Sequence, residues 1–232
     1  MTTGTAPTTG TALITGANRG IGRAVAAELH RRGLDVVLTA RDPEQARAAA
    51  AELGTRWTDL DTTDPDSVAR AAKTVGPPDI LLCNAGVLLD AGTDPLAVPL
   101  ELVERTLRVN LLGTWRVLQE FLPAMVRRGS GHALVVSSGT TAEFGGRLFP
   151  GTPGYSLSKS ALNGLTTLLA ATTEGTGVRV NAVNPGRVRT RMMPGPHQPP
   201  EQAARYIADV ATQPHGGPTG HFFAAHSSTS QE

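Results

Sequence analysis

The chain has 232 residues, of which 40% are hydrophobic and 18% are charged, and its formal net charge is +1. A charge so close to zero, without any run of basic residues, argues against nucleic acid or an anionic membrane surface as a partner. Cys83 is the only cysteine, which excludes an intrachain disulfide, and the six histidines show no ligand spacing, so we expect no metal site.

The Thr/Gly/Pro-rich segment 1–10 lacks the basic start and apolar stretch of a signal peptide. No stretch approaches the roughly 20 apolar residues that are needed to span a bilayer. We therefore expect a cytoplasmic protein with a flexible tail over residues 1–10 and a frayed C-terminus over residues 227–232.

Between these ends, short apolar runs alternate with longer helical patterns. In chain order, the patterns predict a strand over 12–15, a helix over 20–32, a strand over 36–39, helices over 42–54 and 64–75, a strand over 80–83, a long helix over 100–127, a strand over 133–136, a helix over 155–172 and a strand over 178–181. About the last thirty residues break this rhythm, although Phe222 and Phe223 are expected to close a last strand. Strands that are apolar on both faces and separated by helices are typical of a parallel sheet covered on both sides. We predict one doubly wound α/β domain over residues 11–226.

The turn between the first predicted strand and helix contains Gly16, Gly20 and Gly22. Such glycines permit a tight turn and a close approach of the backbone to a pyrophosphate, and the helix N-terminus that follows offers free N–H groups to the anion. The spacing is GxxxGxG, not the GxGxxG of the dinucleotide fingerprint. A merely flexible turn is the alternative, but the position before the first helix favours phosphate binding.

The end of the second predicted strand is where the adenosine ribose of a dinucleotide would lie. An acidic residue there would hold the 2′-hydroxyl of NAD, whereas arginine suits the 2′-phosphate of NADP, and the chain has Arg41. Asp42 is better explained as the cap of the next helix, and Arg19 is a second candidate cation. This pattern favours NADP(H) over NAD(H); the alternative is that Arg41 is a solvated loop residue.

Tyr155 and Lys159 are four residues apart in a predicted helix, so their side chains share a face. Because a neighbouring ammonium favours the phenolate, we expect Lys159 to lower the pKa of Tyr155 from its usual value near 10. The pair is then a plausible general acid/base. Ser137 and Ser138 follow a predicted strand, where a hydroxyl could support the charge on a carbonyl oxygen.

Together these motifs resemble those of classical short-chain dehydrogenases/reductases, over about residues 11–223. The matching segments are the glycine turn 15–22, Asn84-Ala85-Gly86, Val136-Ser137-Ser138, Tyr155-Ser-Leu-Ser-Lys159, Asn184-Pro185-Gly186 and the asparagine in Arg-Val-Asn110-Leu. The resemblance implies a Rossmann-like parallel sheet of about seven strands with helices on both faces. It also implies catalytic roles: Ser138 orients the carbonyl, Tyr155 donates the proton, Lys159 lowers its pKa and binds the nicotinamide ribose, and Asn110 holds a water that links Lys159 to solvent.

The resemblance further implies a set of cofactor-binding residues: Gly16, Asn18, Arg19, Gly20, Ile21, Gly22, Arg41, Leu60, Asp61, Asn84, Ala85, Gly86, Tyr155, Lys159, Pro185, Gly186, Val188 and Thr190. Asp61 matches the residue that contacts adenine, although a simple turn aspartate is the alternative. Thr190 matches the threonine that binds the nicotinamide carboxamide.

Two segments depart from the family pattern, and we expect them to face the substrate: 139–154, which is about four residues longer than usual, and 187–200, a short lid. The candidate residues are Glu143, Phe144, Arg147, Phe149, Arg187, Met192 and Met193. For any one of these residues, an irregular surface loop is an equally good reading.

The resemblance and the ending 217–223, which is similar to that of carbonyl reductases, imply reversible reduction of a ketone, aldehyde or imine with NADPH. They also imply a homotetramer or homodimer built from the long helices. Two alternatives stay open. One is a non-redox reaction on the same scaffold, such as dehydration, cyclisation or epimerisation. The other is a catalytically idle nucleotide-binding protein.

Overall fold

The computed structural model describes residues 10–139 and 148–225. Its strands are β1 (Thr11–Ile14), β2 (Asp35–Ala40), β3 (Arg56–Asp59), β4 (Ile80–Cys83), β5 (Gly131–Val136), β6 (Val178–Asn184) and β7 (Phe222–Ala224). Its helices are α1 (Gly20–Arg31), α2 (Pro43–Leu53), α3 (Pro65–Val75), α4 (Leu100–Leu107), the π-helix η1 (Arg108–Gly113), α5 (Thr114–Arg128), α6 (Pro153–Thr172) and α7 (Pro200–Ala211).

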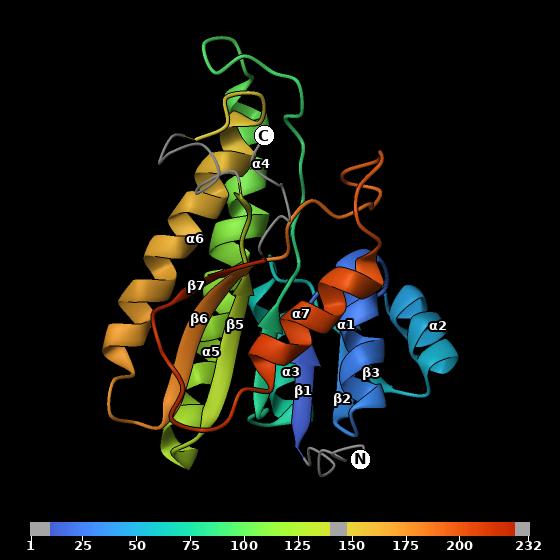
Figure 1. Cartoon of the computed structure of the whole chain (residues 1–232), viewed down its shortest axis with the longest axis vertical. Helices are drawn as coiled ribbons and strands as arrows, with labels where there is room; N and C mark the ends of the chain where they lie inside the picture. The colour runs from blue at the N-terminus through green and yellow to red at the C-terminus, as the bar shows by residue number, and fades with distance from the viewer. Residues whose placement is uncertain (1–9, 140–147, 226–232) are drawn as a thin grey trace, which may run out of the picture.

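The seven strands form one sheet in the order β3-β2-β1-β4-β5-β6-β7, and every neighbouring pair is parallel (Figure 1). The chain order reverses between β1 and β4, which is where an open α/β sheet forms its ligand crevice. This topology confirms the predicted Rossmann-like, doubly wound parallel sheet. It also confirms that Phe222 and Phe223 lie in the last strand.

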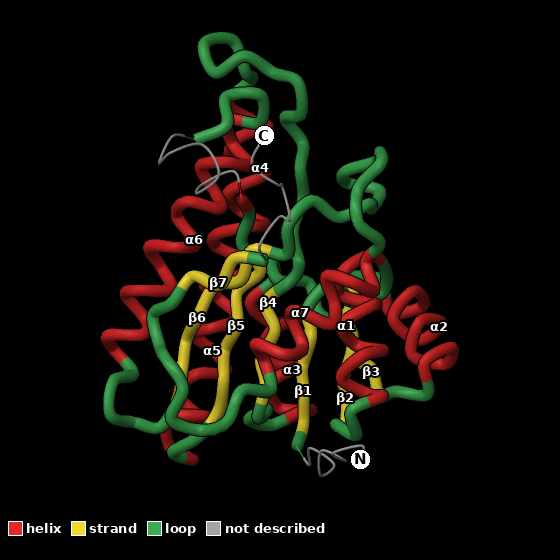
Figure 2. The backbone as a smooth tube through the Cα atoms, viewed as in Figure 1, coloured by secondary structure: helices red, strands yellow, loops and turns green. Residues whose placement is uncertain are grey.

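Helices cover both faces of the sheet, with α1, α2 and α7 on one side and α3, α5 and α6 on the other (Figures 1 and 2). Successive residues of a strand point to opposite faces. In β1, Ile14 therefore belongs to the buried cluster that also contains Val25 of α1 and Ile207 of α7, while Leu13 belongs to the cluster that contains Phe121 of α5 and Leu162 of α6. These two buried layers hold the carboxyl ends of the strands in fixed positions.

Two segments differ from the sequence-based expectation. The long helix predicted over 100–127 is interrupted by the π-helical turn Arg108–Gly113, which hydrophobic spacing alone does not reveal. The sequence analysis also assigned no helix near residue 200, yet α7 packs against α1 through small buried side chains such as Ala204 and Ala208. Alanine is only weakly hydrophobic, so the spacing of these residues does not mark a buried helix face in the sequence.

None of the helices in the described ranges is long and apolar enough to cross a bilayer. The tail predicted over residues 1–10 and the end predicted over 227–232 fall, apart from Gly10, outside the described residues. Cys83 is buried at the end of β4, where burial raises the pKa of its thiol to about 12, as expected for a small core residue.

Candidate functional site

The sequence motifs converge on the carboxyl edge of the sheet. The glycine turn follows β1, Asn84-Ala85-Gly86 follows β4, Ser137 and Ser138 follow β5, and Pro185-Gly186 follows β6. Because these strands are parallel neighbours, the four segments lie along one edge. The structure thus brings together residues that are up to about 170 positions apart, which is where ligands bind in such sheets.

The turn after β1 requires glycine at specific positions. Gly16 has φ +64° and Gly20 has φ +56°, a region that disfavours other side chains. A Cβ on Gly16 would lie 2.9 Å from the Cα of Ala85, and a Cβ on Gly22 would overlap the side-chain amide of Asn84. At Gly20, by contrast, a Cβ would only touch Thr190 at 3.6 Å. Gly16 and Gly22 therefore allow close backbone packing, while Gly20 supplies the left-handed turn.

Asn84 and Thr15 join the glycine turn to the end of β4. The side-chain amide of Asn84 donates to the carbonyls of Thr15 and Gly16, both at 3.0 Å. The hydroxyl of Thr15 accepts from the backbone N–H of Asn84 at 3.0 Å and of Ala85 at 3.1 Å. These four bonds fix the shape of the crevice floor. Thr15 was not among the predicted site residues.

The N-terminus of α1 has no capping side chain in the described part of the chain. Its N-cap residue, Arg19, makes no side-chain cap, and the first turn contains no acidic residue. Elsewhere in the described ranges, α2 and α3 are capped by Asp42 and Asp64, while α4 and α7 have Glu101 and Glu201 in their first turns. Free N–H groups and the positive end of a helix dipole suit an anion, so this turn fits the pyrophosphate of a dinucleotide.

The expected ribose-phosphate end lies directly after β2. Arg41 is exposed, and neither it nor Arg19 has an ion-pair partner within the part of the chain that the structure describes. Asp42 accepts from the N–H groups of Glu44 and Gln45 at 3.0 and 3.3 Å, which confirms it as the cap of α2. The two guanidinium groups are therefore available to a phosphate.

The loop after β3 contains the candidate adenine contacts. Leu60 is buried, and one oxygen of Asp61 accepts from the N–H and the hydroxyl of Thr63 at 2.8 and 2.7 Å. Asp61 thus has the geometry of a turn aspartate, and its contact with adenine stays a prediction. Asn18, a further candidate from the glycine turn, donates to the side chain of Gln45 at 2.7 Å and so links the turn to α2.

The structure brings together the side chains that the sequence analysis proposed for proton transfer. The side chain of Ser138 hydrogen-bonds to Tyr155, and the ammonium of Lys159 lies 5.6 Å from the centre of the tyrosine ring. Lys159 is buried, and its ammonium donates to the carbonyl of Val136 at 2.7 Å. A hydroxyl, a phenol and an ammonium thus meet where β5 ends and α6 begins.

Burial dominates the electrostatics of this group. It raises the pKa of Tyr155, with the hydrogen bond from Ser138 acting in the opposite direction, and it lowers the pKa of Lys159 to about 8. Within the protein alone, the cost of desolvating the phenolate therefore exceeds the benefit of the hydrogen bond from Ser138. The expectation that Lys159 lowers the pKa of Tyr155 stays a prediction.

Asn110 lies in the π-helical turn and is completely buried. Its oxygen accepts from the N–H of Val87 at 2.8 Å, and its amide donates to the carbonyl of Val87 at 2.9 Å and to the hydroxyl of Ser158 at 3.0 Å. The Ser158 hydroxyl donates in turn to the carbonyl of Tyr155 at 2.7 Å. Asn110 therefore connects the loop after β4 to the helix of the tyrosine, and its role in holding a water stays a prediction.

Gly86 is packed between two members of the predicted tetrad. A Cβ at this position would lie 3.3 Å from the oxygen of Asn110 and 3.8 Å from the ammonium of Lys159. A larger side chain here would therefore press on both residues. The asparagine-alanine-glycine segment thus packs against Asn110 and Lys159 as well as against the glycine turn.

The segment after β6 folds back on itself without a helix before α7. Val188 is buried and forms a bridge with Gln198, whose side chain donates to the carbonyl of Pro185 at 2.7 Å. The hydroxyl of Thr190 accepts from the N–H of Met193 at 3.2 Å. The segment expected to form a short lid is therefore a non-helical loop that is closed by the bridge between Val188 and Gln198.

The remaining candidates for substrate contact are exposed or fall outside the description. Phe149, Met192 and Met193 expose 37%, 39% and 38% of their surface, and Arg187 is also exposed. Glu143, Phe144 and Arg147 lie outside the described residues. Contact with substrate stays a prediction for all seven.

Besides Thr15, sequence reasoning missed Asp90, which touches this site. Asp90, in the loop after β4, is completely buried and accepts from the backbone N–H groups of Gly154 and Tyr155 at 2.5 and 3.2 Å. No motif or periodicity marks an aspartate in an irregular loop. Its role becomes visible only when residues 64 positions apart are brought into contact.

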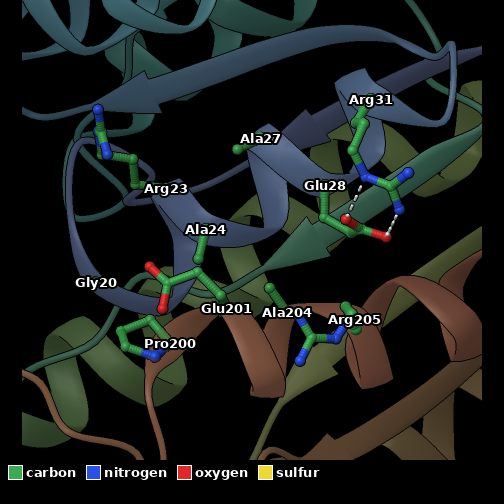
Figure 3. Close-up of a pocket in the computed structure, with 10 residues that line it drawn as sticks. All are labelled: Gly20, Arg23, Ala24, Ala27, Glu28, Arg31, Pro200, Glu201, Ala204 and Arg205. Atoms are coloured by element: carbon green, nitrogen blue, oxygen red, sulfur yellow. Dashed lines mark hydrogen bonds and ion pairs between the residues drawn. The ribbon is translucent and has the colours of Figure 1, made fainter.

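A surface groove of about 370 Å³ runs between α1 and α7 (Figure 3). Its charged side chains include Arg31, which forms an ion pair with Glu28 at 2.8 Å, and Arg23, which pairs with Glu52. Gly20 of the glycine turn lines it, whereas Ser138, Tyr155 and Lys159 do not. The groove therefore borders the glycine turn but does not include those three side chains. Across the described ranges, no group of three or more His, Cys, Asp or Glu side chains could hold a metal ion.

Comparisons with known proteins point to the same chemistry. The family model described as short chain dehydrogenase matches residues 10–199. Oxidoreductase UcpA of Escherichia coli strain K12 is 37% identical over 195 residues, covering 78% of this chain and 70% of that protein. 1-Deoxy-11-beta-hydroxypentalenate dehydrogenase of Streptomyces exfoliatus is 36% identical over 193 residues, covering 79% of this chain and 69% of that protein. The alcohol dehydrogenase of the archaeon Thermococcus sibiricus, solved in complex with 5-hydroxy-NADP, is similar in structure with a TM-score of 0.83 and 28% identity, over 97% of this chain and 99% of that one.

Proposed function

The chain belongs to the short-chain dehydrogenase/reductase family of nicotinamide-dependent oxidoreductases, and on that premise we propose that it reduces a ketone or aldehyde to an alcohol with NADPH, or catalyses the reverse oxidation. An imine is a further substrate class that the same chemistry would accept. The observation that carries the proposal is the contact of Ser138 with Tyr155 beside the buried Lys159.

In this mechanism, the cofactor supplies the hydride when it is bound, and the protein supplies positioning and the proton. The hydroxyl of Ser138 donates to the carbonyl oxygen, and the hydroxyl of Tyr155 gives its proton to the same oxygen as negative charge develops there. Lys159 carries a positive charge below its pKa of about 8, and that charge favours the phenolate that Tyr155 leaves behind. A raised pKa of Tyr155 keeps the proton on the phenol until the substrate oxygen accepts it.

The preference for NADPH rests on two exposed arginines, Arg41 directly after β2 and Arg19 in the glycine turn, and on the use of the nearby Asp42 as the cap of α2. A guanidinium can hold a 2′-phosphate through two parallel hydrogen bonds. The complex of the archaeal alcohol dehydrogenase with 5-hydroxy-NADP supports a cofactor of the same class. We also propose that Gly16, Gly20, Gly22 and the first turn of α1 hold the pyrophosphate.

Titration of the purified protein with NADPH and with NADH, followed by nicotinamide fluorescence, tests the cofactor proposal without a substrate. We expect NADPH to bind at least about tenfold more tightly, which corresponds to roughly 1.4 kcal/mol. The variant Arg41→Ala should reduce that preference. Tighter binding of NADH would contradict the role of Arg41 and leave the proton-transfer proposal standing, whereas binding of neither cofactor would overturn both.

We also propose a homodimer or homotetramer in which α6 contributes to an interface. Leu157 and Leu168 on α6 and Leu112 at the end of η1 expose 47%, 56% and 49% of their surface. Leu157, Gly164 and Leu168 are spaced by seven and four residues and so share one face of the helix. A Cβ on Gly164 would meet no atom within 4 Å in the described part of the chain, so this face has room for close helix packing. The variant Leu168→Glu should dissociate the assembly in analytical ultracentrifugation, and an unchanged mass would contradict the proposal.

A further inference from the structure

The loop between β4 and α4 contains a buried carboxylate that the proton-transfer scheme does not use. Asp90 has no exposed surface, and no ion pair reaches it within the described ranges. One of its oxygens, Oδ1, has no hydrogen-bond partner in the same part of the chain. Burying a carboxylate without a cation is expensive, so other groups must stabilise it.

The other oxygen of Asp90 caps helix α6. Oδ2 accepts from the N–H groups of Gly154 at 2.5 Å and Tyr155 at 3.2 Å, the second and third residues of the helix. These are the two donors that an N-cap side chain ordinarily satisfies. Thr152, the residue at the N-cap position, makes no such bond, because its hydroxyl is paired with that of Ser156 at 3.0 Å. The positive end of the helix dipole compensates the charge of the carboxylate.

The first turn of α6 packs closely against the loop that contains Asp90. A Cβ on Gly154 would lie 3.1 Å from the Cα of Val103 and 3.2 Å from Oδ2 of Asp90. The N–H of Gly92 donates to the carbonyl of Gly151 at 2.8 Å, which joins the same loop to the segment before α6. The loop after β4 and the first turn of α6 are therefore one packed unit.

Both backbone groups of Tyr155 are held by this unit. Its N–H bonds to Asp90, and its carbonyl accepts from Ser158, which is itself bonded to Asn110. Asn110 also fixes Val87 at the start of the loop. The loop is thus anchored to Asn110 at one end and to the tyrosine's helix at the other.

We propose that Asp90 is a positioning residue for the proton donor, whose carboxylate caps α6 from the loop after β4 and so holds Tyr155 in place for reaction. The proposal deepens the proposed function, since it rests on Tyr155 being the donor. Tyr155 is the third residue of its helix, and an uncapped first turn frays. A displacement of about 1 Å can lower turnover as much as hundredfold, so the cap matters for rate as well as for stability.

Three variants of the full chain separate positioning from general stability: Asp90→Ala, Asp90→Asn and Asp94→Ala. Asp94 is a matched control, because it is exposed in the same loop and caps only its own turn, accepting from Leu96 at 2.9 Å. With NADPH and a carbonyl substrate, we expect Asp90→Ala to lower kcat by about tenfold to hundredfold. Its Kd for NADPH, measured by nicotinamide fluorescence, should change by less than about twofold.

Asp90→Asn should restore most of the kcat, because both bonds go to a single oxygen and an amide oxygen can accept both. A kcat of Asp90→Ala within about twofold of the parent would overturn the proposal. The proposal would also be overturned if Asp90→Asn lost as much kcat as Asp90→Ala. In that case the charge of Asp90, and not its hydrogen bonds to the start of α6, would determine the rate. If Asp90→Ala does not fold, the Asp90→Asn result decides alone.

Amide hydrogen exchange of the peptide 153–159 provides a readout that needs no turnover. In Asp90→Ala this peptide should exchange faster than in the parent and in Asp94→Ala, while the remaining helices keep their protection. If the exchange rate of this peptide in Asp90→Ala equals that in the parent, the proposal that Asp90 caps α6 is overturned. Because exchange does not depend on substrate, a parent chain that reduces no carbonyl compound would contradict the proposed function without deciding the role of Asp90.

Discussion

The N-termini of α1 and α6 lie beyond the same edge of the sheet, but they differ in how their free backbone N–H groups are satisfied. At α1, the N-cap residue Arg19 makes no side-chain cap and the first turn holds no acidic residue, so its N–H groups remain available. At α6, the N-cap residue Thr152 also makes no cap, but the carboxylate of Asp90 fills its place. One helix end is open to an anion from outside the chain, and the other is closed by an anion of the chain itself.

The difference follows from what each helix end has to do. A phosphate-binding turn must offer donors that a ligand can use, so a protein carboxylate there would compete with the phosphate. A helix whose third residue donates a proton must hold that residue still, so its donors are best satisfied within the protein. Local caps such as Asp42 and Asp64, in contrast, serve only their own helices.

The largest effect is expected at the closed helix end. Tyr155→Phe removes the phenolic hydroxyl but leaves the ring and the backbone bonds to Asp90 and Ser158 in place. We expect kcat to fall by about 10² to 10⁴, the range supplied by general acid catalysis, with an unchanged Kd for NADPH. Steady-state kinetics and fluorescence titration of the same preparation would measure both. A variant that retains most of its kcat would show that another group donates the proton.

A second effect at the same end concerns stability. Burial lowers the pKa of Lys159 from 10.5 to about 8, so the folded state binds its proton less tightly than the unfolded state does. Below pH 8 this costs folding free energy, and the cost disappears as the pH rises from 8 to 10.5. Lys159→Met should therefore raise the free energy of unfolding at pH 7 by about 2 kcal/mol, despite the lost bond to Val136, while abolishing turnover.

Urea denaturation at pH 7 and pH 9.5 would test this sign, since the gain should be smaller at the higher pH. Lys73→Met is the matched control, because Lys73 is the other lysine and is exposed on α3. A Lys159→Met protein less stable than the parent at pH 7 would mean that the hydrogen bond to Val136 outweighs the cost of burial.

The sequence predicted the sheet well because the relevant signals are local. The apolar runs of β1, β4 and β5 and the caps and glycines of the intervening turns follow from a few consecutive residues each. The predicted edges of β1 were displaced by one residue, from 12–15 to Thr11–Ile14, since hydrogen bonding and not hydrophobicity sets the ends of a strand. The Asp42 cap was likewise readable from the Asp-Pro start of its helix.

What the sequence could not predict depends on distant partners. The π-helical turn places Asn110 against Val87 and Ser158, and no residue spacing along the chain encodes that contact. Asp90 is one of many loop aspartates until the fold brings it to the start of α6. The raised pKa of Tyr155 likewise reflects how deeply the protein packs around the phenol, which motif matching does not report.

The role of the uncapped N-terminus of α1 can be tested by placing a capping side chain there. Arg19 has extended backbone angles, φ −160° and ψ 174°, as an N-cap residue requires, so Arg19→Asp should place a carboxylate on the first turn of α1. We expect NADPH to bind about tenfold more weakly than to Arg19→Ala, a difference of roughly 1.4 kcal/mol, because the carboxylate competes with the pyrophosphate. Arg19→Ala is the control, since it removes the same guanidinium without adding an acceptor. Equal affinities of the two variants would mean that the pyrophosphate does not use this helix end.

The smallest effect should come from a cap that serves structure alone. Asp64 accepts from the N–H of Asp66 at 2.9 Å at the start of α3, a bond of the same kind that Asp90 makes at α6. Asp64→Ala should lower the free energy of unfolding by about 1 kcal/mol, and Asp64→Asn should largely restore it, because asparagine is also a good cap. Urea denaturation measures the stability, and kcat with NADPH should stay at the parent value in both variants. If Asp64→Ala lowered kcat as Asp90→Ala is expected to, loss of any helix cap would slow the reaction through general loosening, and the separate role of the closed end of α6 would disappear.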